Sequence, residues 1–276
     1  MRTFTVAACQ LDSRNDKAAN VETALSAIDH AADAGADLVS LPELFTFLGP
    51  TDEILENAES IPGPTVDRLA ELARERGVWI HAGSIYERAT DGPAGDGDRA
   101  YNTTVLLDDA GEIVATYRKL HLFDVEIGDE VSVLESERVA PGEDVVAVET
   151  PFGTLGLAVC YDLRFPDLFA ALSRRGADVL FLPAAFTLQT GKDHWEPLLR
   201  ARAIENQAYV VAAGQVGRKP NGVTTYGNSM IVDPWGTVVS RIGERTGVVT
   251  AEIDLDYLDR VRRELPSLSH RRFDVY

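Results

Sequence analysis

The sequence predicts an α/β protein, and more narrowly a four-layer α-β-β-α sandwich built from two similar halves. Strand-like and helix-like segments alternate along the chain, which is typical of α/β folds. The same order of segments occurs twice, and two such halves can stack sheet against sheet with their helices outside. We therefore expect a single domain over residues 1–276. Two independent domains are the alternative, but no long polar linker near residues 140–152 supports them.

The evidence for two halves is a set of short segments that recur in the same order. Residues 35–45 and 176–186 both begin with Gly-Ala-Asp, continue with apolar residues and reach Leu-Pro. Other matches pair residues 7–9 with 158–160, 82–83 with 213–214, and 106–114 with 231–239. Each match is weak alone, but their shared order indicates an internal duplication.

In the first half the apolar pattern predicts strand, helix, strand, helix, strand and then a hairpin. Residues 18–34 have helical periodicity, and Pro64 marks the start of a second helix over residues 65–76. An Asp-Asp-Ala-Gly turn joins the two strands of the hairpin. Short apolar runs predict the strands, at residues 6–11, 38–41, 78–85, 103–107 and 113–117.

The second half repeats this order, with helices expected near residues 167–175 and 193–207. Two segments fall outside the regular pattern. Residues 88–100 are rich in Gly and Asp and are expected to form an exposed loop between strands. Residues 126–142 form a longer irregular stretch, the kind that often lines a functional site.

The chain is strongly acidic, with 44 acidic and 26 basic residues and a formal net charge of -18. Only four of the basic residues are lysine. Such a composition resembles that of proteins from salt-loving organisms, since salt screens the self-repulsion of the acidic side chains. The acidic residues are scattered rather than gathered in a tail. A surface of this charge makes nucleic acid a poor partner.

The composition also bears on location. At 45% hydrophobic residues the chain has enough apolar material for a sizeable core, yet no apolar run approaches the roughly 18 residues of a membrane span. The first residues run directly into a strand-like segment, so we expect no signal peptide. With only two cysteines, a disulfide framework is not indicated, and we expect a cytoplasmic protein without membrane partners.

Cys160 is the most informative single residue. It ends an apolar run that predicts a buried strand, and Pro166 can open a helix a few residues later. A strand-to-helix junction exposes the side chain at the strand end and aims backbone N–H groups at whatever binds there. This geometry suits a nucleophile. A buried structural thiol is the alternative.

Differences between the similar halves point to Glu43, which stands where the second half has Ala184. A carboxylate directly after a buried strand and a proline is costly unless it has a partner. We interpret it as a general base, with a helix cap as the alternative.

Lys119 is the second unusual charged residue. A chain with four lysines keeps one at the end of a strand, beside an apolar stretch. A lysine can stabilise a developing oxyanion and lower the pKa of a neighbouring thiol. A solvated surface lysine is the alternative. Because Glu43, Lys119 and Cys160 all follow strands, stacked sheets can bring them into one crevice.

These residues carry a family resemblance. Residues 41–43, 117–121 and 160–166 resemble the three signature segments of the nitrilase superfamily, the carbon–nitrogen hydrolases. The resemblance extends from about residue 4 to the C-terminus and implies the nitrilase-like fold. Within the superfamily the chain is most similar to the amidases that act on deaminated glutathione, and next to the omega-amidases. One departure is the acidic segment at residues 128–133.

The resemblance implies a mechanism without metal or organic cofactor. Glu43 takes the thiol proton as Cys160 attacks an amide carbon, and Lys119 and the backbone N–H of Tyr161 hold the oxyanion. Ammonia leaves, and Glu43 then activates the water that hydrolyses the thioester. Glu135 matches the second glutamate of the family, which orients the lysine and the water. An ordinary exposed acidic residue is the alternative for Glu135.

Four further residues match substrate-binding positions. The resemblance places Tyr161, Arg164, Phe186 and Thr190 around a small acidic amide, with Arg164 pairing with a carboxylate. The alternatives are an ion pair of Arg164 with Asp162 or Asp167, core packing for Phe186 and a plain loop hydroxyl for Thr190. The resemblance also implies a homodimer or larger homo-oligomer, formed through residues 167–175 and the C-terminal tail.

Three functions are therefore open. The leading one is an amidase for a small ω-amide of the deaminated-glutathione or α-keto-acid type. A nitrilase or an N-carbamoyl-amide hydrolase would use the same three residues. A binding protein that has kept the fold and lost turnover is the alternative from another class. A reactive Cys160 would favour the enzyme, and an inert Cys160 in folded protein would favour the binding protein.

Overall fold

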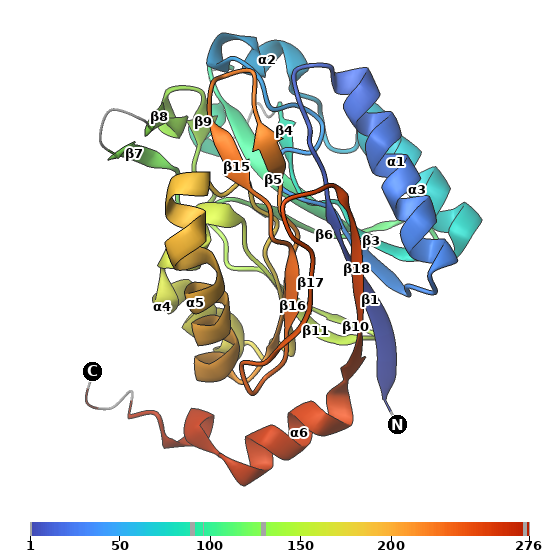
Figure 1. Ribbon diagram of the computed structural model, residues 1–276, viewed down its shortest axis with the longest axis vertical. Helices are drawn as coiled ribbons and strands as arrows, with labels where there is room; N and C mark the ends of the chain where they lie inside the picture. Colours follow the sequence, from blue (N-terminus) through green and yellow to red (C-terminus); the bar gives the residue numbers. More distant parts are fainter. Residues whose placement is uncertain (1, 89–91, 96, 128–130, 273–274, 276) are drawn as a thin grey trace.

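The computed structural model describes residues 2–88, 92–95, 97–127, 131–272 and 275. Two β-sheets face each other, with helices on their outer sides (Figure 1). This arrangement confirms the predicted α/β fold.

The first sheet has the strand order β18-β1-β2-β3-β5-β4, with β6 and β9 also paired to β5. Helices α1 (Lys17–Asp33) and α3 (Pro64–Arg76) lie side by side on its outer face, and α2 (Ile54–Asn57) is a single turn. The strands are β1 (Thr3–Gln10), β2 (Leu38–Ser40), β3 (Trp79–His81), β4 (Ile85–Glu87), β5 (Ala100–Leu107), β6 (Ile113–Arg118), β9 (Val139–Ala140) and β18 (Gly247–Asp254).

The second sheet has the order β10-β11-β12-β13-β16-β17. Helices α4 (Pro166–Arg174) and α5 (Leu188–Asn206) cover it, whereas α6 (Leu255–Glu264) extends away from both sheets (Figure 1). The strands are β10 (Ala147–Thr150), β11 (Gly153–Leu157), β12 (Val179–Phe181), β13 (Tyr209–Ala212), β16 (Met230–Val232) and β17 (Val238–Arg241). Two separate hairpins pair β7 (Asp124–Ile127) with β8 (Val131–Leu134) and β14 (Val216–Arg218) with β15 (Thr224–Tyr226).

The duplication predicted from the sequence is visible in the strand pairing. In each half three consecutive strands are parallel, β1-β2-β3 and β11-β12-β13, and the next partner is antiparallel. The recurring Gly-Ala-Asp segment has the same role twice. The Asp37 carboxylate accepts the N–H of Thr5 at 2.7 Å, and the Asp178 carboxylate accepts that of Thr154 at 2.9 Å. Each aspartate thus fixes the register of its strand against the preceding one.

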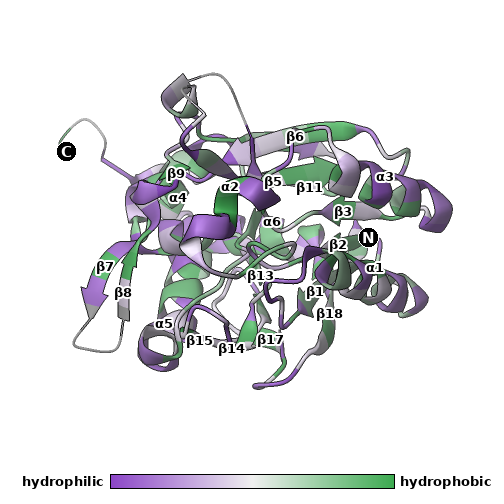
Figure 2. Cartoon of the chain, turned by 90° about the horizontal axis from the view of Figure 1, so that it is seen from above, coloured by the Kyte–Doolittle hydropathy of each residue, from purple (hydrophilic) through white to green (hydrophobic). Residues whose placement is uncertain are grey.

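The main core lies between the sheets. Alternate residues of β1 divide between two clusters: Val6 and Ala8 face the second sheet, while Ala7 and Cys9 face α1 and α3. This period of two is what a strand covered on both sides requires. Figure 2 shows mostly hydrophobic residues in the central strands and hydrophilic ones on α1 and α3.

Two predicted elements have different bounds. The strand expected over residues 78–85 is two strands, because Gly83 between β3 and β4 has a φ of +51° and a Cβ there would lie 2.0 Å from the Pro42 carbonyl oxygen. The helix expected from residue 193 begins at Leu188. Thr187 caps it by accepting the N–H of Thr190, so the capping threonine sets a start that the apolar pattern missed.

The two irregular segments are more ordered than expected. Within residues 126–142, β8 completes a hairpin with β7 and β9 joins the first sheet, so the expectation of an irregular stretch is wrong there. Residues 128–130 of the acidic segment lie outside the described residues, as do residues 89–91 and 96 of the expected exposed loop. Ala94 in that loop is fully buried, and its N–H donates to the Tyr101 hydroxyl.

Candidate active site

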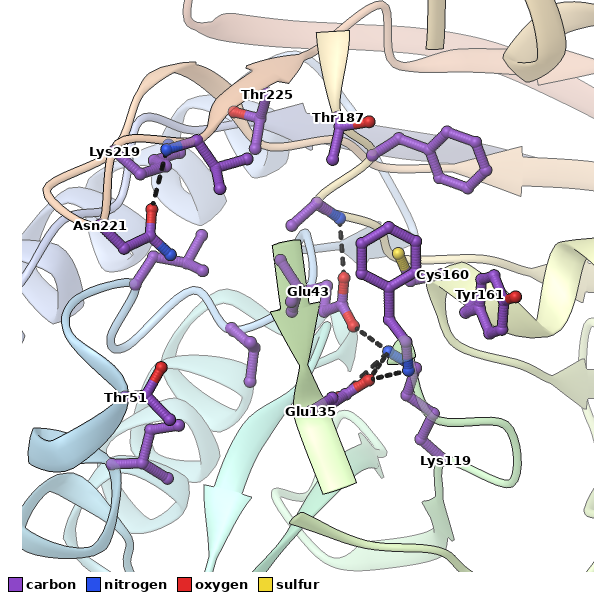
Figure 3. Close-up of a pocket in the computed structure, with 18 of the residues that line it drawn as sticks. Glu43, Thr51, Lys119, Glu135, Cys160, Tyr161, Thr187, Lys219, Asn221 and Thr225 are labelled. Carbon is purple, nitrogen blue, oxygen red and sulfur yellow. Dashed lines mark hydrogen bonds and ion pairs between the residues drawn. The ribbon is translucent and has the colours of Figure 1, made fainter. Parts of the chain in front are cut away.

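One pocket gathers the ends of several strands (Figure 3). Glu43 follows β2, Lys119 follows β6, Glu135 follows β8, and Cys160 lies between β11 and α4. All four side chains line this pocket. For Glu43, Lys119 and Cys160, their positions at strand ends predicted that they would meet in one crevice. The lining then continues to Thr51 and to the β14–β15 hairpin.

Cys160 has a backbone conformation that L-residues rarely adopt. Its φ is +48°, and its N–H donates to the Pro183 carbonyl at 2.9 Å. Asp162, fully buried, holds the turn: it accepts the N–H of Val159 at 2.8 Å and the hydroxyl of Tyr117 at 2.7 Å. Strained residues of this kind persist where the surroundings fix them, and they cluster at functional sites.

Asp162 also binds the loop that carries Lys119. Its second carboxylate oxygen accepts the His121 backbone N–H at 3.1 Å and lies 2.7 Å from His121 Nδ1. The His121 ring stacks on Phe165 at 3.7 Å between centroids. One buried carboxylate therefore couples the nucleophile turn to the segment after β6.

Lys119 lies between two carboxylates. Its Nζ is 2.9 Å from Glu43 Oε1 and 2.9 Å from Glu135 Oε2, and its side chain is 2% exposed. The other oxygen of Glu43 accepts the Ala185 N–H at 2.8 Å, and Glu135 accepts the Phe123 N–H at 2.6 Å. The alternatives of a helix cap for Glu43, a surface lysine for Lys119 and an exposed acid for Glu135 are therefore wrong.

Burial and these charges set the protonation of the site. Burial alone lowers the pKa of Lys119, but Glu135 and Glu43 outweigh it and hold that pKa well above its ordinary value. Burial, followed by the negative charge of Glu43, raises the pKa of the Cys160 thiol well above its ordinary value. The resting site thus holds an ammonium ion beside a neutral thiol, which needs a base before it can attack.

Asn102 is a member of the cluster that sequence reasoning missed. It is fully buried on β5, and its Nδ2 donates to Glu43 Oε1 at 2.9 Å and to Glu135 Oε1 at 3.2 Å. Its Oδ1 has no hydrogen-bond partner among the described residues. The two carboxylates fix the amide orientation, because only the NH₂ group can face them both. An asparagine among the aromatic, β-branched and apolar residues of β5 was the available signal, since asparagine is depleted in strands.

Gln215, also missed, holds the main chain of Glu43. Its Nε2 donates to the Glu43 carbonyl at 3.1 Å and to the Ser13 hydroxyl at 2.9 Å. On the other side of the same peptide bond, the Leu44 N–H donates to the Ser84 hydroxyl at 3.0 Å. Leu44 has a φ of +51°, so the strained turn that aims Glu43 is held at both ends.

The four predicted substrate-binding residues, Tyr161, Arg164, Phe186 and Thr190, all line the pocket. The Arg164 guanidinium lies over the rings of Phe186 and Tyr161, at 5.2 and 5.9 Å from their centroids. Within the described part of the chain it pairs with no carboxylate, so the ion pair with Asp162 or Asp167 does not form.

Phe186 fits both interpretations considered for it, whereas Thr190 does not fit its alternative. Phe186 packs against Trp195 at 5.0 Å between centroids, so it both lines the pocket and joins the core. Thr190 is part of α5, and its hydroxyl lies 3.0 Å from that of Thr187. It is therefore not a plain loop residue.

The residues present fit nucleophilic chemistry on a carbonyl carbon. A thiol, a carboxylate and an ammonium ion share one pocket, which provides a nucleophile, a base and an electrostatic stabiliser. Among the described residues no group of three or more His, Cys, Asp and Glu side chains is arranged to hold a metal ion.

Comparison with known proteins identifies the family to which the chain is similar. Residues 5–263 match the family described as carbon–nitrogen hydrolase. The chain is 48% identical over 273 residues to the deaminated glutathione amidase of Homo sapiens, with 98% of this chain and 83% of that protein covered. The deaminated glutathione amidase of Synechocystis is 46% identical, with 99% and 100% covered. The crystal structure of Saccharomyces cerevisiae Nit3, a member of branch 10 of the nitrilase superfamily, superposes with a TM-score of 0.87 at 32% identity and covers 98% of this chain and 97% of that one.

Proposed function

Because the chain belongs to the carbon–nitrogen hydrolase family, as its motifs predicted, we propose that it has the catalytic residues of an amidase. These residues are Cys160, Glu43, Lys119 and Glu135. The substrate we propose is a small ω-amide of an α-keto acid, deaminated glutathione in particular. The observation that carries this proposal is the pocket itself, in which a thiol, two carboxylates and an ammonium ion are buried together.

Acylation begins with the neutral thiol. Glu43, whose negative charge bears on Cys160, takes the proton as sulfur attacks the amide carbon. The Lys119 ammonium and the backbone N–H of Tyr161 stabilise the oxyanion that forms. Tyr161 is the second residue of the helical turn Cys160–Arg164, and the first N–H groups of a helix have no acceptor within the helix. The proton on Glu43 then passes to the amide nitrogen, the C–N bond breaks, and a thioester and a free amine result.

In deacylation, water is the nucleophile and the Cys160 thiolate is the leaving group. Glu43 takes a proton from water, hydroxide attacks the thioester carbon, and the thiolate leaves and regains its proton from Glu43. Glu135 holds Lys119 from the other side, with Nζ distances of 3.1 and 2.9 Å to its two oxygens. Lys119 therefore stays charged and in place through both steps.

Arg164 supports an acidic substrate. Its guanidinium lies over two aromatic rings, and one of its nitrogen atoms is 3.3 Å from His194 Nδ1. Among the described residues it pairs with no carboxylate. An arginine in such surroundings suits the carboxylate of a keto acid. The amine that leaves depends on the amide: α-ketoglutaramate releases ammonia, whereas deaminated glutathione releases cysteinylglycine.

We propose further that residues 1–276 act as one domain in a cytoplasmic homo-oligomer adapted to high salt. No helix in the described residues combines the length and apolar character needed to span a membrane. Large apolar side chains on the surface support association, since Ile204, Trp235 and Leu265 are 49%, 59% and 50% exposed. Light scattering in molar salt would give the number of subunits.

The experiment that tests the function is a substrate panel in molar salt. It contains α-ketoglutaramate, deaminated glutathione, a simple nitrile and an N-carbamoyl amino acid, each with wild type and Cys160→Ala. We expect hydrolysis of at least one amide, abolished by Cys160→Ala. Turnover of only the nitrile or the carbamoyl compound would replace the amidase proposal, and no turnover by folded protein would favour a silent binding protein.

A further inference from the structure

The pocket does not end at the nucleophile. Beyond Glu43, on the side away from Cys160 and Tyr161, it is lined by Thr51 and by residues of the β14–β15 hairpin (Figure 3). We define the distal end of the pocket by Thr51, Lys219, Asn221, Val223 and Thr225. None of these residues takes part in the chemistry described above.

The hairpin that forms the distal end is firmly attached. Its strands are joined to the rest of the site through the Tyr226 N–H, which donates to the Phe186 carbonyl at 2.8 Å, and through a β-bridge between Thr187 and Thr225. Gln215, just before β14, binds the carbonyl of Glu43. The distance from the hairpin to the catalytic groups is therefore fixed by contacts on both sides.

Lys219 holds the turn of the hairpin rather than a ligand. Its Nζ lies 2.9 Å from Asp12 Oδ1, 2.9 Å from the Val216 carbonyl and 3.3 Å from Gln215 Oε1. An ammonium ion has three N–H donors, and these three acceptors account for them. The charge is matched by Asp12, so Lys219 does not select an anion.

Asn221 and Thr51 are the polar groups left for a ligand. Asn221 Oδ1 accepts the Val223 N–H at 3.2 Å, which leaves its NH₂ group as a donor with no acceptor among the described residues. The Thr51 hydroxyl likewise makes no side-chain hydrogen bond within the described part of the chain. Apolar side chains line the same pocket, including those of Leu48 and Ile54. This combination suits a peptide-like fragment, which has both carbonyl oxygens and apolar surface.

We propose that the distal end of the pocket binds the amine fragment of the substrate, and that Asn221 donates to a carbonyl or carboxylate oxygen of a peptide-like leaving group. This inference rests on the proposed function. Ammonia has no oxygen for Asn221 to bind, whereas cysteinylglycine has an amide carbonyl and a carboxylate. Asn221 would therefore favour an amide of a dipeptide over a primary amide with the same acyl half.

Two substrates isolate this contribution, because deaminated glutathione and α-ketoglutaramate share one acyl half and give the same thioester. Release of the common keto acid can be followed in one coupled assay for both. We would compare kcat/KM for wild type, Asn221→Ala and Asn221→Asp. The aspartate keeps the oxygen that accepts the Val223 N–H and replaces the donor with a negative charge. Arg218→Ala is the control, since this residue is exposed on the same hairpin and does not line the pocket.

The inference predicts a selective loss. For Asn221→Ala, kcat/KM for deaminated glutathione falls about tenfold while that for α-ketoglutaramate stays within about twofold. Asn221→Asp has a lower kcat/KM than Asn221→Ala for deaminated glutathione, but not for α-ketoglutaramate. Arg218→Ala changes neither. Equal losses on both substrates, or no loss on deaminated glutathione, would overturn the inference and leave the proposed function standing. Failure of wild type to hydrolyse either amide would overturn both.

Discussion

The Lys119 ammonium and the Glu43 carboxylate are 2.9 Å apart, and both side chains are almost fully buried. An ion pair removed from water is stabilised only when the remaining hydrogen-bonding groups also find partners. Here Glu135, Asn102 and the Ala185 N–H provide them. The cluster is thus a connected polar network whose members depend on one another, although Asn102 Oδ1 has no partner among the described residues.

Removal of the central cation is expected to cost both activity and stability. Lys119→Met leaves Glu43 and Glu135 buried without their shared counter-ion, which should lower the free energy of unfolding by about 3–5 kcal/mol. Loss of the oxyanion donor should lower kcat/KM by a factor of about 100 or more. Lys192→Met, at an exposed position outside the pocket, is the matched control. A Lys119→Met protein with more than a tenth of wild-type kcat/KM would contradict this role.

Asn102 is expected to position the two carboxylates. Asn102→Ala removes the donor that Glu43 and Glu135 share, so kcat/KM should fall about tenfold or more while the protein stays folded. Asn102→Asp fills the same space without the NH₂ donor, so it should lose at least as much activity, whereas a loss of packing alone would spare it. The measurement is kcat/KM of folded variants and wild type, with the exposed Asn15→Ala as control. An Asn102→Asp protein with wild-type kcat/KM would reduce Asn102 to a packing residue.

The sequence was sufficient to predict where the reactive groups lie, because strand ends and the contrast between Glu43 and Ala184 are local signals. It did not reveal Asn102 or Gln215, whose hydrogen bonds to the Glu43 side chain and carbonyl span 59 and 172 residues. The strand order of the first sheet brings Asn102 to Glu43, and the stacking of the second sheet on the first brings Gln215 there; no periodicity records either pair. Similarly, the start of α5 depends on one capping hydroxyl, that of Thr187, rather than on apolar spacing.

His81 is expected to contribute to acid denaturation. It is fully buried between the hydroxyls of Ser40 and Thr104, at 2.9 Å from each, and burial lowers its pKa to about 3. Between pH 6.5 and 3 the unfolded chain therefore binds a proton that the folded protein does not. Its contribution is fully present above pH 6.5 and is lost as pH falls, by up to about 1.4 kcal/mol per pH unit. Urea titrations of wild type and His81→Gln across this range would measure it; parallel pH dependences would contradict the assignment.

The net charge of -18 predicts stabilisation by salt. Raising potassium chloride from 0.1 to 2 M screens repulsion between surface carboxylates, so Tm should rise by about 5 °C or more. Chloride is the appropriate anion, because sulfate also strengthens apolar burial. Differential scanning calorimetry would measure the effect, with glycerol of equal osmolality as control. A Tm independent of chloride concentration would contradict the adaptation to salt.

The central claim is that Cys160 forms a thioester with the keto-acid half of the amide. The most direct test mixes wild type with deaminated glutathione or α-ketoglutaramate, stops the reaction in acid within one turnover, and measures the protein by mass spectrometry. We predict the same acyl adduct from both amides, on the peptide that contains Cys160 and absent in Cys160→Ala. Hydrolysis without any adduct on Cys160, or with an adduct on another residue, would contradict the claim.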